Sequence, residues 1–176
     1  MTDADRFEAF VREYQQMVYA TAVRLLGRAA EAEDVAQTVF LKAFQQFGEL
    51  EGRPTVPGWL KTVTTNLCLN HLSRYRRRWQ FFSEVDAGDG GETPFEGRLA
   101  QPAADAADAD DEAARHARVH AALAALPDHQ RVPLVLFHFE SQSYEQIAQV
   151  LGVSLAKVKT DIFRGREVLR RVLGGA

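Results

Sequence analysis

The stretch that decides the fold is Ser143-Tyr-Glu-Gln-Ile-Ala-Gln-Val-Leu-Gly-Val-Ser154, and an amphipathic run follows it from Leu155 to Leu173. Ser143 and Gln146 have the spacing of a capping box, which opens a helix. Gly152 permits a tight turn, and Ser154 can cap the helix that follows. A short helix, a turn that contains glycine and a longer helix are the parts of a helix-turn-helix. The stretch therefore predicts a motif whose second helix can enter the major groove of DNA.

The second helix of this motif carries polar and basic side chains at three- and four-residue steps. Side chains that can read base edges are expected on its outward stripe, which contains Lys157, Thr160, Asp161 and Arg164. Phosphate contacts are expected from Lys159, Arg166, Arg170 and Arg171. A helical hairpin with a basic surface that binds no DNA is the alternative, and the clustering of lysine and arginine favours DNA.

Two more helices are expected before the motif. An apolar stripe predicts one helix from about Asp111 to Ala125. Pro127 breaks it, and Asp128 can cap the next helix. Pro133 lies just past the first turn of that next helix and removes a backbone hydrogen bond, so we expect a bend or a late start there.

Charge divides the chain into three parts. Residues 1–82 hold 11 basic and 9 acidic side chains, residues 83–112 hold 1 and 10, and residues 113–176 hold 9 and 5, so the net charges are +2, −9 and +4. The middle part is rich in Ala, Gly and Asp and can bury little apolar surface, which predicts a linker or a disordered segment. We therefore expect two domains, 1–82 and 113–176, joined by an acidic linker. The alternative is that the charge pattern has no functional meaning, because loops are often acidic.

The first domain has helical periodicity throughout. One apolar stripe runs from Phe7 to Leu26, a second runs from Val35 to Phe47, and a glycine that can end a helix follows each of them. A loop from Glu49 to Val56 comes next, and Pro57 suits the first turn of a third helix. No segment alternates with period two for long enough to form a strand. The predicted fold class is therefore all-α, with two small helical domains.

The third helix ends in Arg74-Tyr-Arg-Arg-Arg-Trp79. Arginine binds phosphate through paired hydrogen bonds, and aromatic faces accept unstacked bases, so this run predicts a nucleic-acid surface. Short polar side chains precede it on the same helix: Thr64, Thr65, Asn66, Asn70 and His71. The alternative is a solvated helix C-terminus, where basic residues also favour the macrodipole.

Three motifs in this order resemble the bacterial RNA polymerase sigma factors of the extracytoplasmic-function group. Glu33-Asp-Val-Ala-Gln-Thr-Val-Phe-Leu-Lys-Ala-Phe44 is similar to the helix that binds core polymerase in that family. Pro57 to Asn70, with the arginine-rich end, resembles the helix that engages the minus-10 promoter element. Leu126-Pro-Asp-His-Gln-Arg131 and the helix-turn-helix resemble the domain that reads the minus-35 element.

The resemblance also implies site residues. The polymerase contacts would be Asp34, Gln37, Phe40 and Leu41. Residues 49–56 match a loop that captures a flipped-out promoter base, and minus-10 contacts would come from Arg53, Asn66, Asn70, Arg74, Arg76, Arg77 and Arg78. The minus-35 contacts would come from Lys157, Lys159, Thr160, Asp161, Arg164, Arg166 and Arg170. Thr38, Asn70 and Asp161 depart from the residue types that are commoner in the family.

The function that the resemblance implies is that of an alternative sigma factor. Such a protein binds core RNA polymerase, directs it to promoter DNA and assists promoter opening, with no enzymatic activity and no cofactor of its own. We expect neither an inhibitory extension before the first motif nor a further domain after the last one, so control is expected from an anti-sigma factor. No apolar run approaches the ~18 residues of a membrane span, and no secretory signal is present, so we expect a cytoplasmic protein without membrane insertion.

Two other functions fit parts of the sequence. A regulator that binds DNA without polymerase explains the helix-turn-helix equally well, but it explains neither the Glu33–Phe44 helix nor the arginine-rich run. A metal-dependent enzyme would use His116 and His120, which are four residues apart but lack the glutamate of the metalloprotease arrangement. The single cysteine, Cys68, excludes an intramolecular disulfide and is expected to be a small buried core residue.

Overall fold

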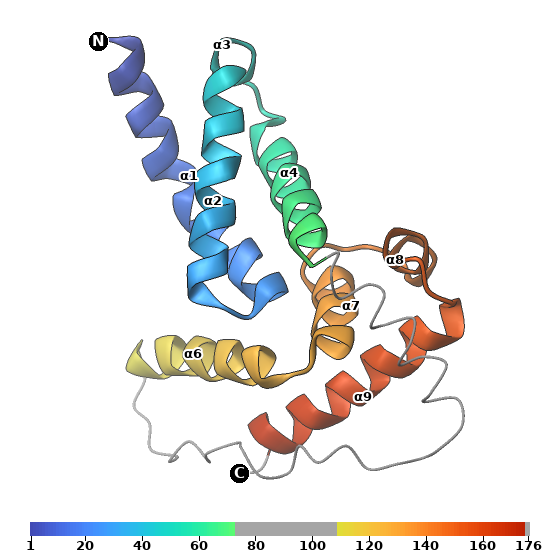
Figure 1. Ribbon diagram of the computed structural model, residues 1–176. Coiled ribbons are helices and arrows are strands. Elements are labelled where there is room, and N and C mark those ends of the chain that lie inside the picture. Colours follow the sequence, from blue (N-terminus) through green and yellow to red (C-terminus); the bar gives the residue numbers. More distant parts are fainter. Residues whose placement is uncertain (73–108, 175–176) are drawn as a thin grey trace. The chain divides into compact units, whose positions relative to one another are not determined.

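The computed structural model describes residues 1–72 and 109–174, and in these ranges every regular element is a helix (Figure 1). The chain divides into two units, Met1–Ser73 and Arg74–Ala176. The predicted all-α fold with two helical parts is therefore confirmed. Residues 83–108 of the predicted acidic linker lie outside the described residues, and so do the arginines from 74 to 78. The domain limits at residues 82 and 113 stay predictions.

The described residues of the N-terminal unit form four helices: α1 (Asp3–Leu26), α2 (Ala29–Gln45), the short α3 (Phe47–Leu50) and α4 (Val56–His71). α1 contacts both α2 and α4, which also contact each other (Figure 1). α1 begins with a capping box between Thr2 and Asp5, and it ends where Gly27 takes a left-handed φ of 71°. Pro57 lies in the first turn of α4, as predicted. The second glycine stop was wrong, because Gly48 lies inside α3.

Small and aliphatic side chains from three helices form the core of this unit. Its most buried members include Val18, Ala22, Leu25, Ala32, Val39, Ala43, Leu60 and Cys68. The predicted burial of Cys68 is confirmed. Thr64 and Thr65 are buried too, so they do not extend the polar surface of α4 as predicted. The Thr64 hydroxyl donates to the carbonyl oxygen of Leu60 at 2.6 Å, which supplies the hydrogen bond that a buried hydroxyl needs.

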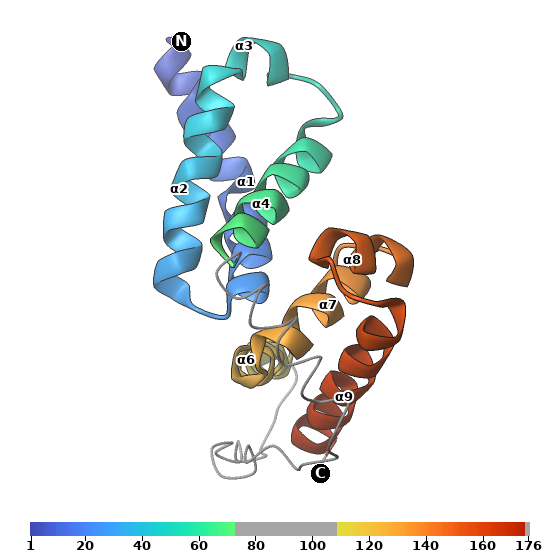
Figure 2. The same cartoon turned by 45° about the vertical axis from the view of Figure 1, so that its right-hand side comes forward.

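The described helices of the C-terminal unit are α6 (Ala109–Ala125), α7 (Asp128–His138), α8 (Tyr144–Leu151) and α9 (Leu155–Leu173). The long α9 contacts α6, α7 and α8, and a short turn joins it to α8 (Figure 2). The buried apolar side chains include Leu123, Val135, Leu136, Ile147, Leu151, Val158 and Ile162. The unit therefore has a core of its own, and α9 supplies one side of it.

The helix-turn-helix prediction is confirmed in its local details. The Ser143 hydroxyl accepts from the Gln146 amide at 3.1 Å, and the Gln146 side chain accepts from the Ser143 amide at 2.9 Å. Gly152 ends α8 with a left-handed φ of 68°. The Ser154 hydroxyl accepts from the Lys157 amide at 3.1 Å and thereby caps α9. Side chains close in sequence thus fix where both helices begin and how the turn between them runs.

The expected cap at Asp128 and the expected late start of α7 were both wrong, while a bend at Pro133 stays a prediction. Pro127 occupies the cap position, and Asp128 is already inside the helix and pairs with Arg131. The Arg131 guanidinium also donates to the carbonyl oxygen of Leu126 at 2.9 Å. It thereby supplies a hydrogen bond to a backbone carbonyl group at the end of α6. The predicted late start is absent, because α7 begins at Asp128 and contains Pro133. Buried side chains on both sides of Pro133 stabilise the helix across it.

Candidate functional site

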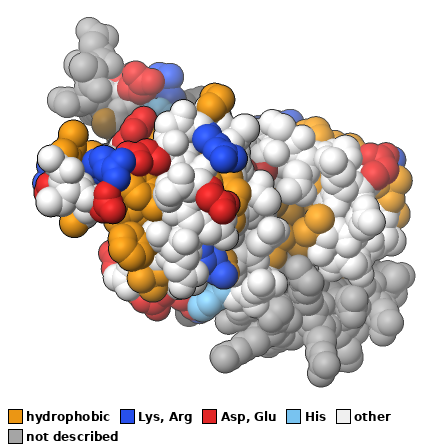
Figure 3. Space-filling view, turned by 90° about the horizontal axis from the view of Figure 1, so that it is seen from above, with side chains coloured by type: hydrophobic (Ala, Val, Ile, Leu, Met, Phe, Trp, Pro, Cys, Tyr) orange, Lys and Arg blue, Asp and Glu red, His pale blue; other side chains and the backbone are white. Residues whose placement is uncertain are grey.

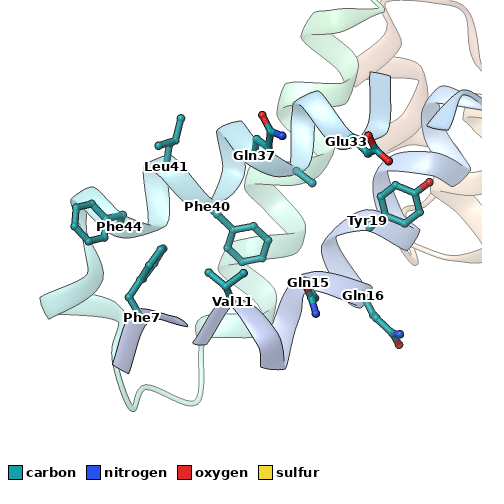
Figure 4. A pocket seen from close by; sticks show the side chains of 11 residues that line it. Phe7, Val11, Gln15, Gln16, Tyr19, Glu33, Gln37, Phe40, Leu41 and Phe44 are labelled. Atoms are coloured by element: carbon teal, nitrogen blue, oxygen red, sulfur yellow. The ribbon is translucent and has the colours of Figure 1, made fainter. Parts of the chain in front are cut away.

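An apolar groove of about 780 Å³ runs between α1 and α2. Its lining side chains come from both helices and are Phe7, Val11, Gln15, Gln16, Tyr19, Glu33, Ala36, Gln37, Phe40, Leu41 and Phe44. In Figure 4 the two rows face each other, and the ring of Phe40 points across the groove toward Val11. The apolar side chains are concentrated at one end, and Glu33 and Tyr19 lie at the other.

The apolar end of the groove is open to water. Leu41 is 65% exposed and Phe44 is 58% exposed, which is unusual for large apolar side chains on the same helix. Hydrophobic side chains reach the surface beside charged ones in the view of Figure 3. Phe7 holds this end in shape, because its ring meets Phe44 at 5.0 Å and Phe47 at 5.2 Å, both edge to face. A contiguous exposed apolar surface of this kind marks an interaction site.

The structure brings most of the predicted polymerase-binding residues together. Gln37, Phe40 and Leu41 line the groove, and Asp34 is exposed on the same helix but does not line it. The contribution of α1 was missed, because its apolar stripe was assigned to the core. The exposed Gln15 and Gln16 beside that stripe were the available signal that α1 forms one wall of an open groove.

A second surface lies on α9, where Lys159, Thr160, Arg164 and Arg170 are exposed as predicted for DNA-contacting side chains. Phe163 is 63% exposed on the same helix and was not singled out from the sequence. The outward placement of Asp161 was wrong, since this residue is only 4% exposed. Its carboxylate pairs with the Lys157 ammonium at 2.9 Å, and the Lys157 side chain is itself only 9% exposed. Burial raises the pKa of Asp161, and the hydrogen bond from Lys157 opposes that rise.

Arg166 is only partly available for DNA. Its Nε donates to Nε2 of His138 at 3.0 Å, and its guanidinium lies over the Phe137 ring at 5.4 Å. Phe137 in turn stacks on Tyr144 of α8 at 4.7 Å. Burial, together with the charge of Arg166, lowers the pKa of His138 and so favours the neutral imidazole, which can accept this hydrogen bond. This cluster joins the end of α7, the start of α8 and the middle of α9.

The predicted minus-10 residues divide into described and undescribed ones. Arg53 is exposed in the loop between α3 and α4, and Asn66 and Asn70 are exposed on α4. His71 at the end of α4 lies 3.3 Å from Glu31 of α2. Arg74, Arg76, Arg77 and Arg78 lie outside the described residues.

Neither a metal centre nor a membrane span is found in the part of the chain that the structure describes. No three His, Cys, Asp or Glu side chains in residues 1–72 and 109–174 gather where they could hold a metal ion, and His116 pairs with Glu112 at 3.8 Å. None of the described helices is both long enough and apolar enough to cross a membrane.

An exposed apolar groove in one helical unit and a helix-turn-helix in another are typical of transcription factors that bind DNA and a further partner. Residues 10–78 match the family described as Sigma-70 region 2, and residues 116–169 match Sigma-70, region 4. The RNA polymerase sigma-H factor of Pseudomonas aeruginosa is 35% identical over 174 residues, which cover 97% of this chain and 88% of that protein. SigW of Bacillus subtilis is 30% identical, with 97% of this chain and 90% of that protein covered.

The chain therefore belongs to the extracytoplasmic-function sigma factors and is an alternative sigma factor that binds RNA polymerase. SigE of Mycolicibacterium smegmatis is also 35% identical, and the match covers 95% of this chain and 61% of that protein. A solved structure of the sigma factor RpoE in complex with the anti-sigma factor NepR from Bartonella quintana is 24% identical over 96% of each chain, with a TM-score of 0.49. A polymerase-independent regulator would account for the region 4 match alone.

Proposed function

We propose that this sigma factor docks on core RNA polymerase through the α1–α2 groove and contacts promoter DNA through α4 and α9. The exposed apolar end of the groove is the observation that carries the polymerase site. Covering Leu41 and Phe44 removes large apolar surface from water, which favours association. Gln37 beside them supplies a polar group that can fix the register of the partner.

The DNA contacts in this proposal come from both units. On α9, Thr160 and Arg164 read base edges, and Lys159 and Arg170 hold phosphates. In the N-terminal unit, the loop with Arg53 and the exposed face of α4 engage the minus-10 element and assist its opening. The arginines from 74 to 78 add positive charge directly after α4 in the sequence.

The remaining parts of the proposal follow from the role of a polymerase subunit. The protein acts as a regulator and carries out no reaction of its own. It works in the cytoplasm, where polymerase and promoters are found. An anti-sigma factor that covers the same apolar groove would exclude polymerase from it, since one surface cannot bind both partners.

Substitution of groove residues tests the polymerase site. Gln37→Ala should weaken association with core polymerase about fivefold, since one lost hydrogen bond is worth about 1 kcal/mol. Leu41→Ser should weaken it more, and neither change should unfold the chain because both side chains are exposed. Gln45→Ala, on the same helix but outside the groove, is the control and should bind normally. Normal association of Gln37→Ala, Gln37→Glu and Leu41→Ser would remove the groove from the interface.

The two roles assigned to α9 can be separated on DNA. Arg164→Ala should relax base preference and weaken holoenzyme binding by about 1–3 kcal/mol if this arginine bonds a guanine in two places. Arg170→Ala should weaken binding equally on all promoters and lower the salt dependence by about one phosphate contact. Binding is measured on promoter variants over a range of salt concentrations. Equal shifts in preference for both variants would contradict the division into reading and anchoring residues.

A further inference from the structure

An arginine in the first turn of α1 is bonded to the loop between α3 and α4. The Nη1 atom of Arg6 donates to Oε2 of Glu51 at 2.7 Å, and its Nη2 atom pairs with Asp3 on its own helix. Arg6 and Glu51 are 45 residues apart in sequence. The backbone hydrogen bonds of the loop are local, such as that from the Arg53 amide to the Leu50 carbonyl at 3.1 Å. These local backbone hydrogen bonds do not connect the loop to α1. The side chain of Arg6 makes that connection.

Helix stability alone does not explain a cation at this place. The positive end of the helix dipole favours acidic residues in the first turn, such as Asp3 and Asp5, and disfavours a guanidinium. The capping box of Thr2 and Asp5 fixes the start of α1 and hence the turn that carries Arg6. Hydrogen bonding to Asp3 and the charge of Glu51 raise the pKa of Arg6. Two carboxylates compensate the unfavourable position, and one of them belongs to the loop.

The loop and α1 also share a groove of about 420 Å³. Ala9, Phe10, Glu13 and Tyr14 line it from α1, and the loop contributes Gly52, Arg53 and Pro54. Gly52 turns the loop with a left-handed φ of 74°, a conformation that other residues adopt only with strain. Arg6 and Glu51 line the same groove, so their ion pair connects its two walls.

We propose that Arg6 is a positioning residue for promoter recognition, because its ion pair with Glu51 holds the loop that carries Arg53 in the arrangement that receives an unstacked promoter base. The inference rests on the proposed function, in which the loop with Arg53 engages the minus-10 element and assists its opening. The side chains of Arg6 and Glu51 are 41% and 38% exposed, so the pair adds little to the stability of the fold. The ion pair instead raises the population of one loop conformation. A loop that takes this conformation more often distinguishes promoter bases better.

The test uses the full chain with core polymerase on promoters that the wild-type holoenzyme selects. The rate of promoter opening is measured on a selected promoter and on versions with one minus-10 base substituted, and the ratio of the two rates is the discrimination. Arg6→Gln and Glu51→Gln should each lower discrimination about two- to fivefold, as expected for one exposed ion pair. The double variant should lower it no further, because both changes remove the same pair. Exchange of the charges, with Arg6→Glu and Glu51→Arg together, should restore it.

The control variant is Arg12→Gln, since Arg12 pairs with Glu8 on the same helix and is also exposed. It should leave discrimination unchanged, and all variants should keep wild-type association with core polymerase and wild-type thermal unfolding. Unchanged discrimination in Arg6→Gln and Glu51→Gln, with a wild-type chain that opens the promoter, overturns the positioning role. A wild-type chain that opens no promoter with core polymerase refutes the proposed function, and this inference falls with it.

Discussion

Asp161 and Lys157 form an ion pair that is almost completely removed from water, with 6% and 9% of their side chains exposed. Burial raises the pKa of Asp161 above its ordinary value of 3.8, and the attraction of Lys157 does not cancel that rise. In a buried pair of this kind the loss of hydration is comparable with the attraction between the charges. Removing one partner should therefore destabilise the unit more than neutralising both.

Lys157→Met tests this balance. It should lower the free energy of unfolding at neutral pH by about 1–3 kcal/mol, because the buried carboxylate loses its hydrogen-bonded cation and keeps only the weaker attraction of His129 and Arg164. Adding Asp161→Asn should recover most of the loss, since no buried charge remains. Urea unfolding of the full chain measures both values. Equal stability of the single and the double variant would show that the carboxylate reaches water once the lysine is gone.

The same pair predicts a pH dependence whose sign follows from the raised pKa of Asp161. The folded chain binds this proton more tightly than the unfolded chain does, so the stabilisation is fully present below pH 3.8 and is lost as pH rises through the raised pKa. Lys157→Met removes an opposing attraction, raises the pKa of Asp161 further and should therefore make the loss larger and extend it to higher pH. The measurement is the unfolding free energy of Lys157→Met minus that of the double variant at several pH values. A difference independent of pH would contradict the assignment to Asp161.

At the level of elements, the crossing of α7 and α9 depends on a glycine in the middle of a helix. A Cβ on Gly165 would lie 3.0 Å from Cδ1 of Leu134 and 3.5 Å from the carbonyl oxygen of Gln130. Gly165→Val should therefore destabilise the chain by about 1–3 kcal/mol through overpacking, although it removes a residue of poor helix propensity. Ala156→Val, at an exposed position of the same helix, should lose only about 0.5 kcal/mol. Thermal unfolding compares the two, and equal losses would contradict a close crossing at Gly165.

The local parts of the fold could be predicted from the sequence, and the parts set by packing between helices could not. The caps at Ser143 and Ser154 and the stop at Gly27 depend on side chains within a few residues of the backbone that they bond. Burial of Asp161 depends on how α9 meets α7, which spacing along one helix does not encode. An apolar stripe also has the same pattern whether another helix or a separate protein covers it. For that reason Gln37, Phe40 and Leu41 were predicted from the resemblance, while the wall formed by α1 was not.

At the scale of the whole molecule, each unit has its own buried core, and the most acidic part of the chain lies in sequence between the residues that form these two cores. Residues 83–112 carry a net charge of −9, and the parts before and after carry +2 and +4. An acidic segment and DNA phosphates compete for the same lysines and arginines. We therefore expect the free chain to bind promoter duplex weakly, and the polymerase to relieve this by giving the acidic segment another basic surface.

Neutralising the acidic segment should strengthen DNA binding by the free chain. The replacement takes Glu92, Glu96, Asp105 and Asp108 to their amides and spares Asp111, which lies 3.6 Å from Arg115 near the start of α6. Affinity for promoter duplex should rise most at low salt, where charges that are not in contact are screened least. Titration of labelled duplex with the free chain at several salt concentrations gives this comparison.

The same variant should initiate less well with core polymerase, because an acidic strand suits a channel lined with lysine and arginine that otherwise holds nucleic acid. Such a strand would occupy the channel until the transcript displaces it, and loss of its charge would weaken that occupancy. A chain in which residues 84–108 are shuffled keeps the charge and should match the wild type in both assays. If the neutralised chain also matches the wild type in duplex affinity and in transcript yield, the segment acts only as a spacer. A higher duplex affinity together with a lower transcript yield would mean that the acidic segment contacts two basic surfaces. In the free chain it would contact the chain's own lysines and arginines, and in the holoenzyme it would contact those of the polymerase.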